Sequence, residues 1–496
     1  MLLLDEMQVR QCKRLNSRTL SYDGLVDQGE QNMKSTDLAD HALVFMFCPF
    51  TDSYAQPVAV FASKNATRGT VLCQLLLQTI LLLEEAGAFI DGVVCDGAST
   101  NRTMWKHLGI SGDVEQEKHF FEHPLDAERN VYMFSDVPHL FKCIRNRLLK
   151  QKYLKVHGRW VKWFHYVSVF KEDEVHKGGL KVCPKITQRH IWPSNMDKMR
   201  VNFATQIFSS SMAAGMKYYQ EQGKSNLSDC EGTIEFTLRL NDLYDALNRR
   251  YPAEGIKQGS SDIRVLKEGM KWLNEWEKEL SDGFITKDMF LARTTAEGLR
   301  VTLNSTTDLC NHLLNKCSFR YVLTAKFNQD PLECFFGKVR QAAGENDHPD
   351  MPTFMQVYRT LSIYTLLKPP KFGNCEATED APILDFACFK SIFKCGENSS
   401  ERQLEELRTK LDGLIDTESW ECEDVFPASS TTAQAVDCII YYVCGYLSRK
   451  LQPMFSCLTC RRSLTVSSSV APEAALTNSK TKGGLTHPNR RLYSLL

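Results

Sequence analysis

The chain has 496 residues, with 60 Lys+Arg balanced by 60 Asp+Glu, and its length predicts roughly two to four domains of about 150 residues each. Zero formal charge excludes a uniformly basic nucleic-acid coat but leaves room for local basic patches. No run of eighteen apolar residues occurs, so no membrane span is expected. The 18 cysteines of so long a chain predict reduced, buried thiols in an intracellular protein rather than a disulfide framework.

The first third of the sequence alternates strand and helix patterns. Short apolar runs predict strands, and longer runs with helical spacing predict helices. The expected strands cover residues 42–49, 89–95 and 131–134, and the expected helices cover residues 66–87, 101–108 and 139–150. Acidic residues follow several of these strands, at the position where open α/β sheets place their functional sites. We therefore expect a layered α/β domain.

The middle and the end of the chain have a different pattern. Helical spacing dominates from about residue 160 and predicts an inserted helical domain. The predicted helices cover residues 196–219, 233–248, 263–281 and 287–303, followed by a helix-rich block at 306–340. A turn-rich break at 347–352 and an acidic stretch at 397–424, expected to contain a helix, come next. The Ser/Thr-rich segment from residue 464 predicts disorder.

Three carboxylates are candidates for a metal-dependent active site. Asp5 follows the apolar run Leu2–Leu4, Asp96 ends another apolar run, and Glu333 lies near the start of an expected helix. Carboxylates brought together from distant segments repel one another unless cations neutralise them. Mg²⁺ binds such groups, and two ions can activate a hydroxyl and stabilise a leaving oxygen in phosphoryl transfer. Taken singly, each of these residues is also compatible with a solvated cap.

Five stretches, taken together and in order, resemble the P element family of transposases and their domesticated THAP-type relatives. The matching stretches are residues 3–7, 94–101, 134–142 with Arg145 and Asn146, 328–337 with Arg340, and 443–446. They cover nearly the whole chain. The resemblance does not extend to the amino-terminal THAP DNA-binding domain, which this sequence lacks.

The resemblance implies an RNase H-like catalytic fold interrupted by a mostly helical GTP-binding insertion. We expect the RNase H-like domain at 1–150 and 305–365, the insertion at 151–304, a carboxy-terminal helical region at 366–463 and a disordered tail at 464–496. The family's Asp-Asp-Glu triad maps onto Asp5, Asp96 and Glu333, which would also be the ligands of two Mg²⁺ ions. Asp136 also lies in a matching stretch, but the residues around it favour a helix-capping position after a strand.

GTP binding is implied by the resemblance and not by a standard nucleotide motif. Gly223-Lys224-Ser225 is not a P-loop, because residue 218 is Tyr where the motif requires Gly. The family's GTP-binding positions match Lys185, Val201, Ser209, Asp245, Asn248 and Asp330. A carboxylate can accept two hydrogen bonds from guanine, and a lysine can neutralise phosphate. Without the resemblance, Asp245 and Asn248 would equally fit an ordinary polar helix face.

Two further features leave alternatives open. Eight Lys and Arg residues lie between Lys142 and Lys162, with no acidic residue among them and with Tyr153, Trp160 and Trp163 nearby. This stretch suits DNA binding by phosphate neutralisation and base stacking, or else a solvated amphipathic helix. Cys457 and Cys460 have the spacing of zinc ligands, but no second pair accompanies them.

The sequence therefore predicts a DNA transposase core that cleaves and joins DNA with Mg²⁺ and uses GTP as a structural cofactor. Its expected partners are transposon ends and target DNA, with possible self-association, no membrane and a nuclear location. A domesticated, catalytically silent protein that binds DNA or protein is the alternative. An unrelated GTPase is disfavoured because the chain has neither a P-loop nor a standard base-reading motif.

Overall fold

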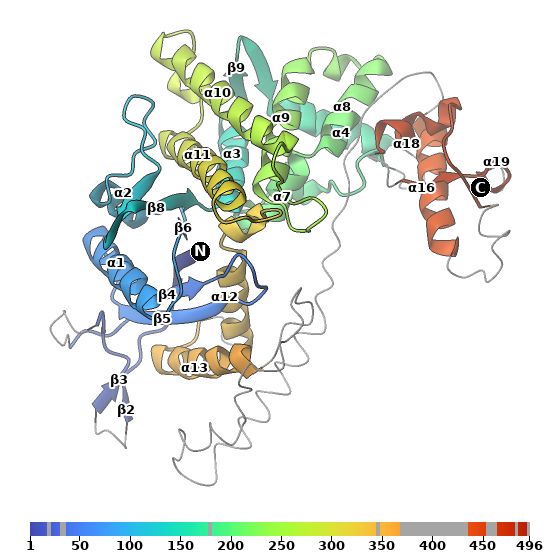
Figure 1. Ribbon diagram of the computed structural model, residues 1–496. Helices are drawn as coiled ribbons and strands as arrows, with labels where there is room; N and C mark the ends of the chain where they lie inside the picture. Colours follow the sequence, from blue (N-terminus) through green and yellow to red (C-terminus); the bar gives the residue numbers. More distant parts are fainter. Residues whose placement is uncertain are drawn as a thin grey trace. The chain divides into compact units, whose positions relative to one another are not determined.

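The computed structural model describes residues 1–16, 21–29, 36–176, 181–343, 348–367, 435–452, 464–481 and 485–493 (Figure 1). These residues form two compact units. The first comprises the described residues of Met1–Val137, Leu247–Lys267 and Glu297–Trp420, and the second those of Pro138–Ala246, Glu268–Ala296 and Glu421–Leu496. The domain boundaries expected from the sequence remain predictions.

The first unit is built on a mixed six-stranded sheet. Its strands are β1 (Leu2–Gln8), β4 (His41–Phe47), β5 (Gln56–Ser63), β6 (Gly92–Cys95), β7 (Phe120–His123) and β8 (Asp126–Ser135), in the order β5-β4-β1-β6-β8-β7. Strands β1, β6 and β8 run parallel in the centre, and antiparallel strands flank them on both sides. A small hairpin of β2 (Arg14–Asn16) and β3 (Ser21–Asp23) accompanies the sheet.

One face of the sheet packs against α1 (Gly69–Glu85) and α2 (Ser99–His107). Helix α1 buries side chains at helical spacing, including Leu72, Leu76 and Ile80, against the strands. The strand residues in this core alternate along each strand, for example Leu2 and Leu4 of β1. Side chains of the intervening residues consequently point to the opposite face.

That opposite face is covered by η4 (Thr324–Phe327), α12 (Asp330–Ala342) and α13 (Met351–Leu367). Helix α12 packs on β1, and α13 packs on β5. The ring of Phe134, on β8, contacts the ring of Phe327 with 5.1 Å between centroids. These helices come from far along the sequence and give the sheet a helical layer on each face, in agreement with the layered α/β domain that the sequence predicts.

The second unit is mostly helical, as expected for an insertion. A hairpin of β9 (Tyr153–Val156) and β10 (Arg159–Lys162) is its main strand element. Its helices are α3 (Val137–Gln151), α4 (Trp163–Val175), α5 (Gln188–Ile191), α6 (Asn195–Met199), α7 (Val201–Ile207), α8 (Ser210–Glu221), η2 (Ser225–Leu227), α9 (Glu231–Leu247), α10 (Ser261–Ser281) and η3 (Lys287–Met289). Helix α11 (Arg293–Asn315) begins in this unit, but most of its residues belong to the first. Helices α3, α9, α10 and α11 carry the chain from one unit to the other.

The carboxy-terminal residues belong to the second unit and centre on α16 (Ala435–Leu451). In the stretch for which the sequence predicts disorder, the described residues form short elements that pack on α16. They are β11 (Thr465–Val466), η6 (Pro472–Ala474), α18 (Ala475–Ser479), β12 (His487–Pro488) and α19 (Arg490–Tyr493).

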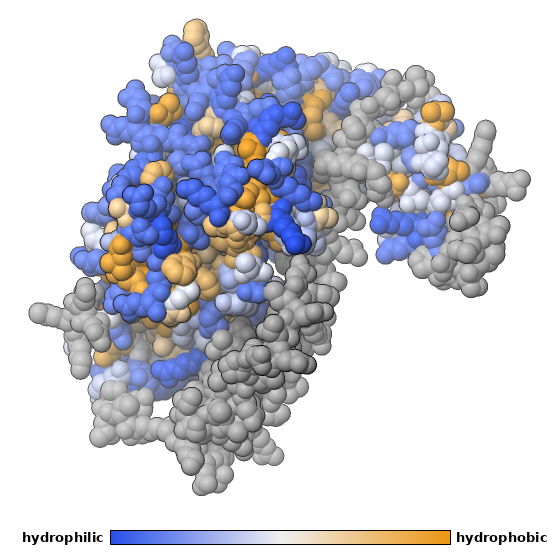
Figure 2. Space-filling model, in the orientation of Figure 1, coloured by the Kyte–Doolittle hydropathy of each residue, from blue (hydrophilic) through white to orange (hydrophobic). Residues whose placement is uncertain are grey.

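Surface and thiol chemistry agree with the composition. The face in Figure 2 is largely hydrophilic over the described residues, with apolar side chains in small scattered groups. None of the described helices is long and apolar enough to cross a membrane. Every cysteine in the described ranges is a free thiol, although Cys143, Cys317 and Cys334 are exposed where buried thiols were expected.

Candidate active site

Three aspartates lie in, or directly after, neighbouring parallel strands. Asp5 is in β1, Asp96 directly follows β6, and Asp136 directly follows β8. The register pairs Leu3 with Val94, which places Asp5 opposite Asp96 two residues further on. Carboxyl ends of parallel strands meet at one edge of a sheet, where α/β proteins place their functional groups.

Side-chain alternation puts these aspartates on the face that carries α12. Leu4 and Cys95 point into the core beneath α1 and α2, so the next residues, Asp5 and Asp96, point to the other face. The same alternation along β8 assigns Met133 to the α1 face. Sheet geometry therefore supports an acidic site beneath the start of α12, although the convergence of the predicted triad stays a prediction.

The first two aspartates are held by local hydrogen bonds. The Asp5 carboxylate accepts a bond from the backbone N–H of Glu6 at 2.7 Å. Asp96 Oδ1 accepts bonds from the backbone N–H of Ala98 at 2.8 Å and from Asn101 Nδ2 at 2.6 Å. Burial raises the pKa of the Cys95 thiol, which lies between them in the sheet, to about 12, and the charges of Asp96 and Asp5 add to this effect. The thiol is therefore neutral and leaves the charge of the site to the carboxylates.

Glu333 reaches the site from the first turn of α12, and its side chain is exposed. One of its carboxylate oxygens lies within 4.8 Å of a carboxylate oxygen of Asp136. Asp136 itself is 1% exposed and precedes α3, where the sequence predicts a capping residue. Either a hard cation or a hydrogen-bond donor to one of the carboxylates would offset their mutual repulsion at this separation. His139, one turn later on α3, belongs to the second unit.

Gln329, a neutral residue that sequence reasoning missed, ties α12 to the sheet. Its backbone N–H donates to Asp136 Oδ1 at 2.8 Å, and its side-chain Nε2 donates to the carbonyl of Leu4 at 2.7 Å. The start of α12, with Glu333 in its first turn, is thereby fastened to the strand that carries Asp5. The residue lies inside a stretch that the sequence singles out, but nothing in its chemistry distinguishes it there from a solvated glutamine.

Two of the predicted nucleotide-binding residues are linked within the second unit. Ser209 caps α8, its side chain accepting a bond from Met212 N–H at 3.2 Å. The next residue, Ser210, donates its backbone N–H to Asn241 Oδ1 at 3.0 Å, and Asn241 Nδ2 donates to Asp245 Oδ2 at 3.2 Å. Asn241, a buried residue that the sequence did not single out, therefore connects the α8 cap to Asp245.

The other predicted nucleotide-binding residues of this unit lie on separate elements. Lys185 is exposed in the loop before α5, and Val201 is the first residue of α7. The loop of Lys185 is anchored by the buried Asp173, whose oxygens accept bonds from Val182 N–H at 2.8 Å and Cys183 N–H at 2.9 Å. The backbone just before Lys185 is thereby fixed, while the role of its side chain stays a prediction.

Asn248 and Asp330 belong to the first unit, where both have protein partners. Asn328 Nδ2 donates to Asn248 Oδ1 at 3.2 Å, and Arg250 Nη2 donates to Asp330 Oδ2 at 2.7 Å. Burial raises the pKa of Asp330, an effect that the positive charge of Arg250 opposes. The segment after α9 is thus connected to the turn that begins α12.

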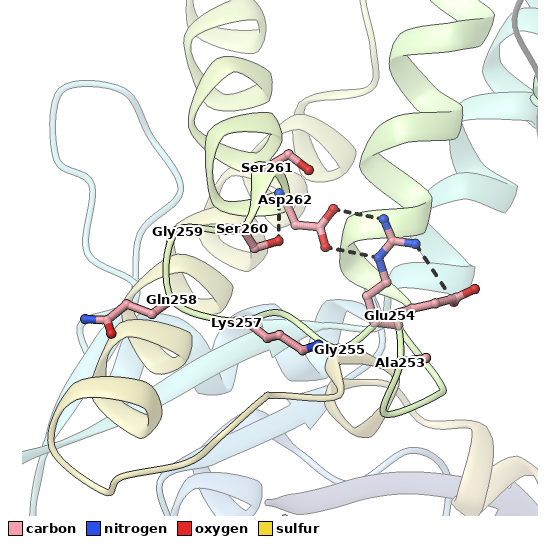
Figure 3. A pocket seen from close by; sticks show the side chains of 10 residues that line it. Ala253, Glu254, Gly255, Lys257, Gln258, Gly259, Ser260, Ser261 and Asp262 are labelled. Carbon is pink, nitrogen blue, oxygen red and sulfur yellow. Dashed lines mark hydrogen bonds and ion pairs between the residues drawn. The ribbon is translucent and has the colours of Figure 1, made fainter. Parts of the chain in front are cut away.

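A shallow pocket of about 500 Å³ lies near this segment (Figure 3). It is lined by the loop of residues 253–261, by Arg249 and by Asp262 at the start of α10. Arg249 and Asp262 form a two-bond ion pair with N···O distances of 3.1 and 2.9 Å, which closes the loop. None of the six predicted nucleotide-binding residues lines this pocket.

The basic stretch does not form a single helix. It comprises the end of α3 and the β9–β10 hairpin. Four of its eight basic residues are engaged inside the second unit. Arg145 and Arg147 donate to the carbonyls of Lys198 and Phe290, each at 2.9 Å, while Arg159 pairs with Glu235 and Lys162 with Asp229. The stretch is therefore a helix only as far as Gln151, and its binding of DNA stays a prediction.

The hairpin nevertheless keeps an exposed aromatic pair. Tyr153 and Trp160 are 44% and 40% exposed, and their rings meet edge to face with centroids 5.5 Å apart. Lys155 Nζ lies 5.7 Å from the Trp160 ring, and Lys150 and Lys152 are exposed nearby in sequence. Cationic groups beside accessible rings fit a polynucleotide.

Two expectations lie outside the described residues. They are the helix within the acidic stretch 397–424 and the possible zinc pair Cys457 and Cys460.

Comparison with protein families assigns most of the chain. Residues 1–109 match the TNP-like RNase H N-terminal domain, and residues 138–259 match the TNP-like GTP-binding insertion domain. Residues 325–359 match the TNP-like RNase H C-terminal domain, and residues 428–496 match the C-terminal domain of DNA transposase THAP9.

Individual relatives agree with these domains. The chain is 28% identical over 271 residues to the Transposable element P transposase of Drosophila melanogaster, covering 54% of this chain and 34% of that protein. It is 25% identical over 515 residues to human DNA transposase THAP9, covering all of this chain and 55% of that protein. The chain thus spans between a third and just over half of the length of these curated relatives.

A solved structure shares the fold. The Drosophila P element transposase strand transfer complex matches with a TM-score of 0.61 and 24% identity, covering 73% of this chain and 76% of that chain. This likeness, with the central sheet, supports the RNase H-like fold. The four matched domains, which together cover most of the chain, show that it belongs to the P element-type family of transposases, with an RNase H-like domain and a GTP-binding insertion domain.

Proposed function

We propose that this chain is a DNA transposase core that cleaves DNA phosphodiester bonds and transfers the cut strand. The observation that carries the proposal is the bond from Gln329 to Leu4, which fastens the helix start bearing Glu333 to the strand bearing Asp5. Asp96, on the next strand, is held by Asn101 at the same edge of the sheet. In this proposal Asp5, Asp96 and Glu333 form the catalytic triad.

The carboxylates fit divalent ions of the Mg²⁺ class, because such cations prefer charged oxygen ligands. Asp5, Asp96 and Glu333 would hold two of them, and bound metal would supply a nucleophile at neutral pH and stabilise the leaving oxygen. The protein's own contribution is to fix the carboxylates on regular elements: Asp5 within a strand, Asp96 directly after a strand and Glu333 in the first turn of a helix.

The insertion domain would bind GTP as a structural cofactor. Asp245 and Asp330 are suited to accept hydrogen bonds from the guanine N–H groups, and Lys185 is suited to neutralise phosphate. Val201, Ser209 and Asn248 would complete the site. The family match of residues 138–259 supports this proposal, as does the hydrogen-bonded link from the α8 cap to Asp245.

Transposon ends and target DNA would be the substrates, so the protein would act in the nucleus. The resemblance to the family also implies self-association, and we include it in the proposal.

Nicking of supercoiled plasmid DNA by this chain, with Mg²⁺ or Mn²⁺ and GTP, tests the proposal. We expect metal-dependent nicking that disappears in Asp5→Asn, Asp96→Asn and Glu333→Gln. A wild-type chain that binds DNA and GTP but does not nick would instead establish the alternative, a catalytically silent binding protein. Nicking that persists in all three variants would exclude this triad.

A further inference from the structure

Gln329 occupies an unusual position for an uncharged side chain. It is the residue directly before α12, it is 1% exposed, and its carbonyl accepts the backbone N–H groups of Leu332 at 2.9 Å and Glu333 at 3.0 Å. The first turn of the helix is therefore built on this residue. Any shift of Gln329 also shifts the backbone of Glu333.

Two hydrogen bonds fix Gln329 in two directions. The backbone N–H reaches Asp136 at the end of β8, and the side-chain amide reaches Leu4 in β1. The two strands lie on either side of β6, which carries Asp96 at its end. The start of α12 is thus held across the strand ends where the aspartates of the candidate site lie.

Asp136 has the chemistry of an acceptor for this helix start. A buried carboxylate is costly unless it is hydrogen-bonded, and the Gln329 N–H supplies such a bond to Oδ1. A negative charge at the amino end of α12 is also stabilised by the helix dipole. Glu333, by contrast, is exposed and can direct its carboxylate to a ligand.

We propose that Gln329 and Asp136 form a positioning pair that holds Glu333 in place, with Asp136 acting as a hydrogen-bond acceptor and not as a metal ligand. The consequence for metal binding rests on the function proposed above. The attachment of the start of α12 to the sheet does not depend on that function.

The substitution Asp136→Asn separates the two roles of this carboxyl. Asparagine keeps an oxygen that can accept the Gln329 N–H, but it loses the charge that a hard cation requires. Asp136→Ala removes both properties. Gln329→Met keeps the size of the side chain and removes its donor, and Gln341→Met is a matched control at an exposed position of the same helix.

Hydrogen exchange of a peptide covering residues 325–336 measures the fastening directly, without metal or DNA. We expect Gln329→Met and Asp136→Ala to speed exchange at the amides of Leu332 and Glu333 by about three- to tenfold, since each loses one hydrogen bond. Asp136→Asn and Gln341→Met should exchange like the wild type. Unchanged exchange in both Gln329→Met and Asp136→Ala would overturn the positioning pair.

Calorimetric titration with Mn²⁺ measures the consequence for the site. Loss of a positioning contact typically weakens metal binding by about 10- to 100-fold, so we expect this loss in Gln329→Met and Asp136→Ala. Asp136→Asn should bind nearly as tightly as the wild type, whereas Glu333→Gln should not. If Asp136→Asn loses Mn²⁺ as Glu333→Gln does, Asp136 is a ligand and the proposal is wrong.

The two measurements also separate this proposal from the function on which it builds. If the wild type binds no Mn²⁺, the metal site of the proposed function fails, and the exchange data alone decide the positioning pair. If Gln329→Met does not fold, the comparison of Asp136→Asn with Asp136→Ala decides it in the same way.

Discussion

Arg250 donates a hydrogen bond to Asp330 at 2.7 Å, and so joins the segment after α9 to the first residue of α12. Burial raises the pKa of the Asp330 carboxyl above its ordinary value, while the guanidinium of Arg250 lowers it. The charge of Asp330 therefore depends on a partner that is three residues beyond α9. Because Asp330 is proposed to bind guanine, this ion pair has a consequence for the pH dependence of nucleotide binding.

We predict that GTP affinity falls on acidification at a pH above that expected for an ordinary aspartate. The carboxylate must be ionised to accept hydrogen bonds from guanine, and a raised pKa means that protonation begins at higher pH. Arg250→Gln removes the charge that lowers this pKa, so the loss of affinity should begin at still higher pH. Calorimetric titration with GTP over a series of pH values measures both effects.

Two controls accompany that series. Asp330→Asn should bind GTP weakly with little dependence on pH, and Lys257→Gln, in the pocket of Figure 3, should behave as the wild type. Coincident pH profiles for the wild type and Arg250→Gln would show that the ion pair does not control nucleotide binding.

A second prediction concerns Asp245, which Asn241 holds on α9. Asp245→Ala should weaken GTP binding by about 1.5–3 kcal/mol, roughly ten- to hundredfold, because a hydrogen bond to a charged group is lost. Glu235→Ala removes an exposed carboxylate from the same helix, one that pairs with Arg159 and not with Asn241, and should leave the affinity unchanged. Calorimetry with GTP and ATP measures this, and equal binding of the two nucleotides would contradict a guanine-reading role. We expect no GTP hydrolysis, because the proposed role of the nucleotide is structural.

A third prediction concerns the exposed aromatic pair on the β9–β10 hairpin. Trp160→Ala should weaken binding of single-stranded DNA by about 1–3 kcal/mol if a base stacks on this ring. Trp192→Ala is the matched control, because Trp192 is 51% exposed on the same unit but lies outside the basic stretch. Fluorescence anisotropy with a labelled oligonucleotide gives both affinities, and equal losses in the two variants would remove the hairpin from the DNA interface.

The central elements of the fold were predictable because their signals are local. The apolar run at 89–95 contains β6, and the leucine-rich run at 66–87 contains α1. Each pattern reflects burial against one face, so the side chains alone indicate the element. The pairing of β1 between β4 and β6 is not a local property, and it required the family resemblance or the structure.

The predicted helices were wrong where short polar side chains or charged residues determine the backbone conformation. Apolar spacing at 196–219 predicts one helix, but the structure has three, because the backbone is extended at Arg200 and at Ser209. The Ser209 hydroxyl caps the following helix, an effect that periodicity does not register. The β9–β10 hairpin was not predicted either, because the basic residues of this stretch also fit the solvent-exposed face of a helix.

The candidate site likewise contains residues that the sequence could identify and residues that only the structure identifies. Charged residues such as Asp5, Asp96 and Glu333 could be singled out from the sequence because their chemistry is explicit. The neutral residues that connect them, Gln329 and Asn241, act through hydrogen bonds to segments far away in the chain. The amino-acid sequence of a single chain contains no local signal for such tertiary contacts.

The last prediction concerns Glu333→Gln, which preserves size and removes one negative charge. A neutral amide is a poor ligand for Mg²⁺, and a loss of about 4 kcal/mol of transition-state stabilisation would slow DNA cleavage roughly a thousandfold. Thermal unfolding should change little, because the exposed Glu333 side chain gains by losing its repulsion from the nearby Asp136. GTP affinity should persist, because Asp330 and its Arg250 partner are intact.

Glu221→Gln is the matched control for this substitution, since Glu221 is an exposed glutamate at the end of α8. It should retain wild-type nicking of supercoiled plasmid. Full activity in Glu333→Gln would remove Glu333 from the triad. Losing a metal-ligand carboxylate at an exposed position should reduce DNA cleavage without changing folding or GTP binding. Loss of activity together with loss of folding or of GTP binding would therefore assign Glu333 a structural role at the start of α12.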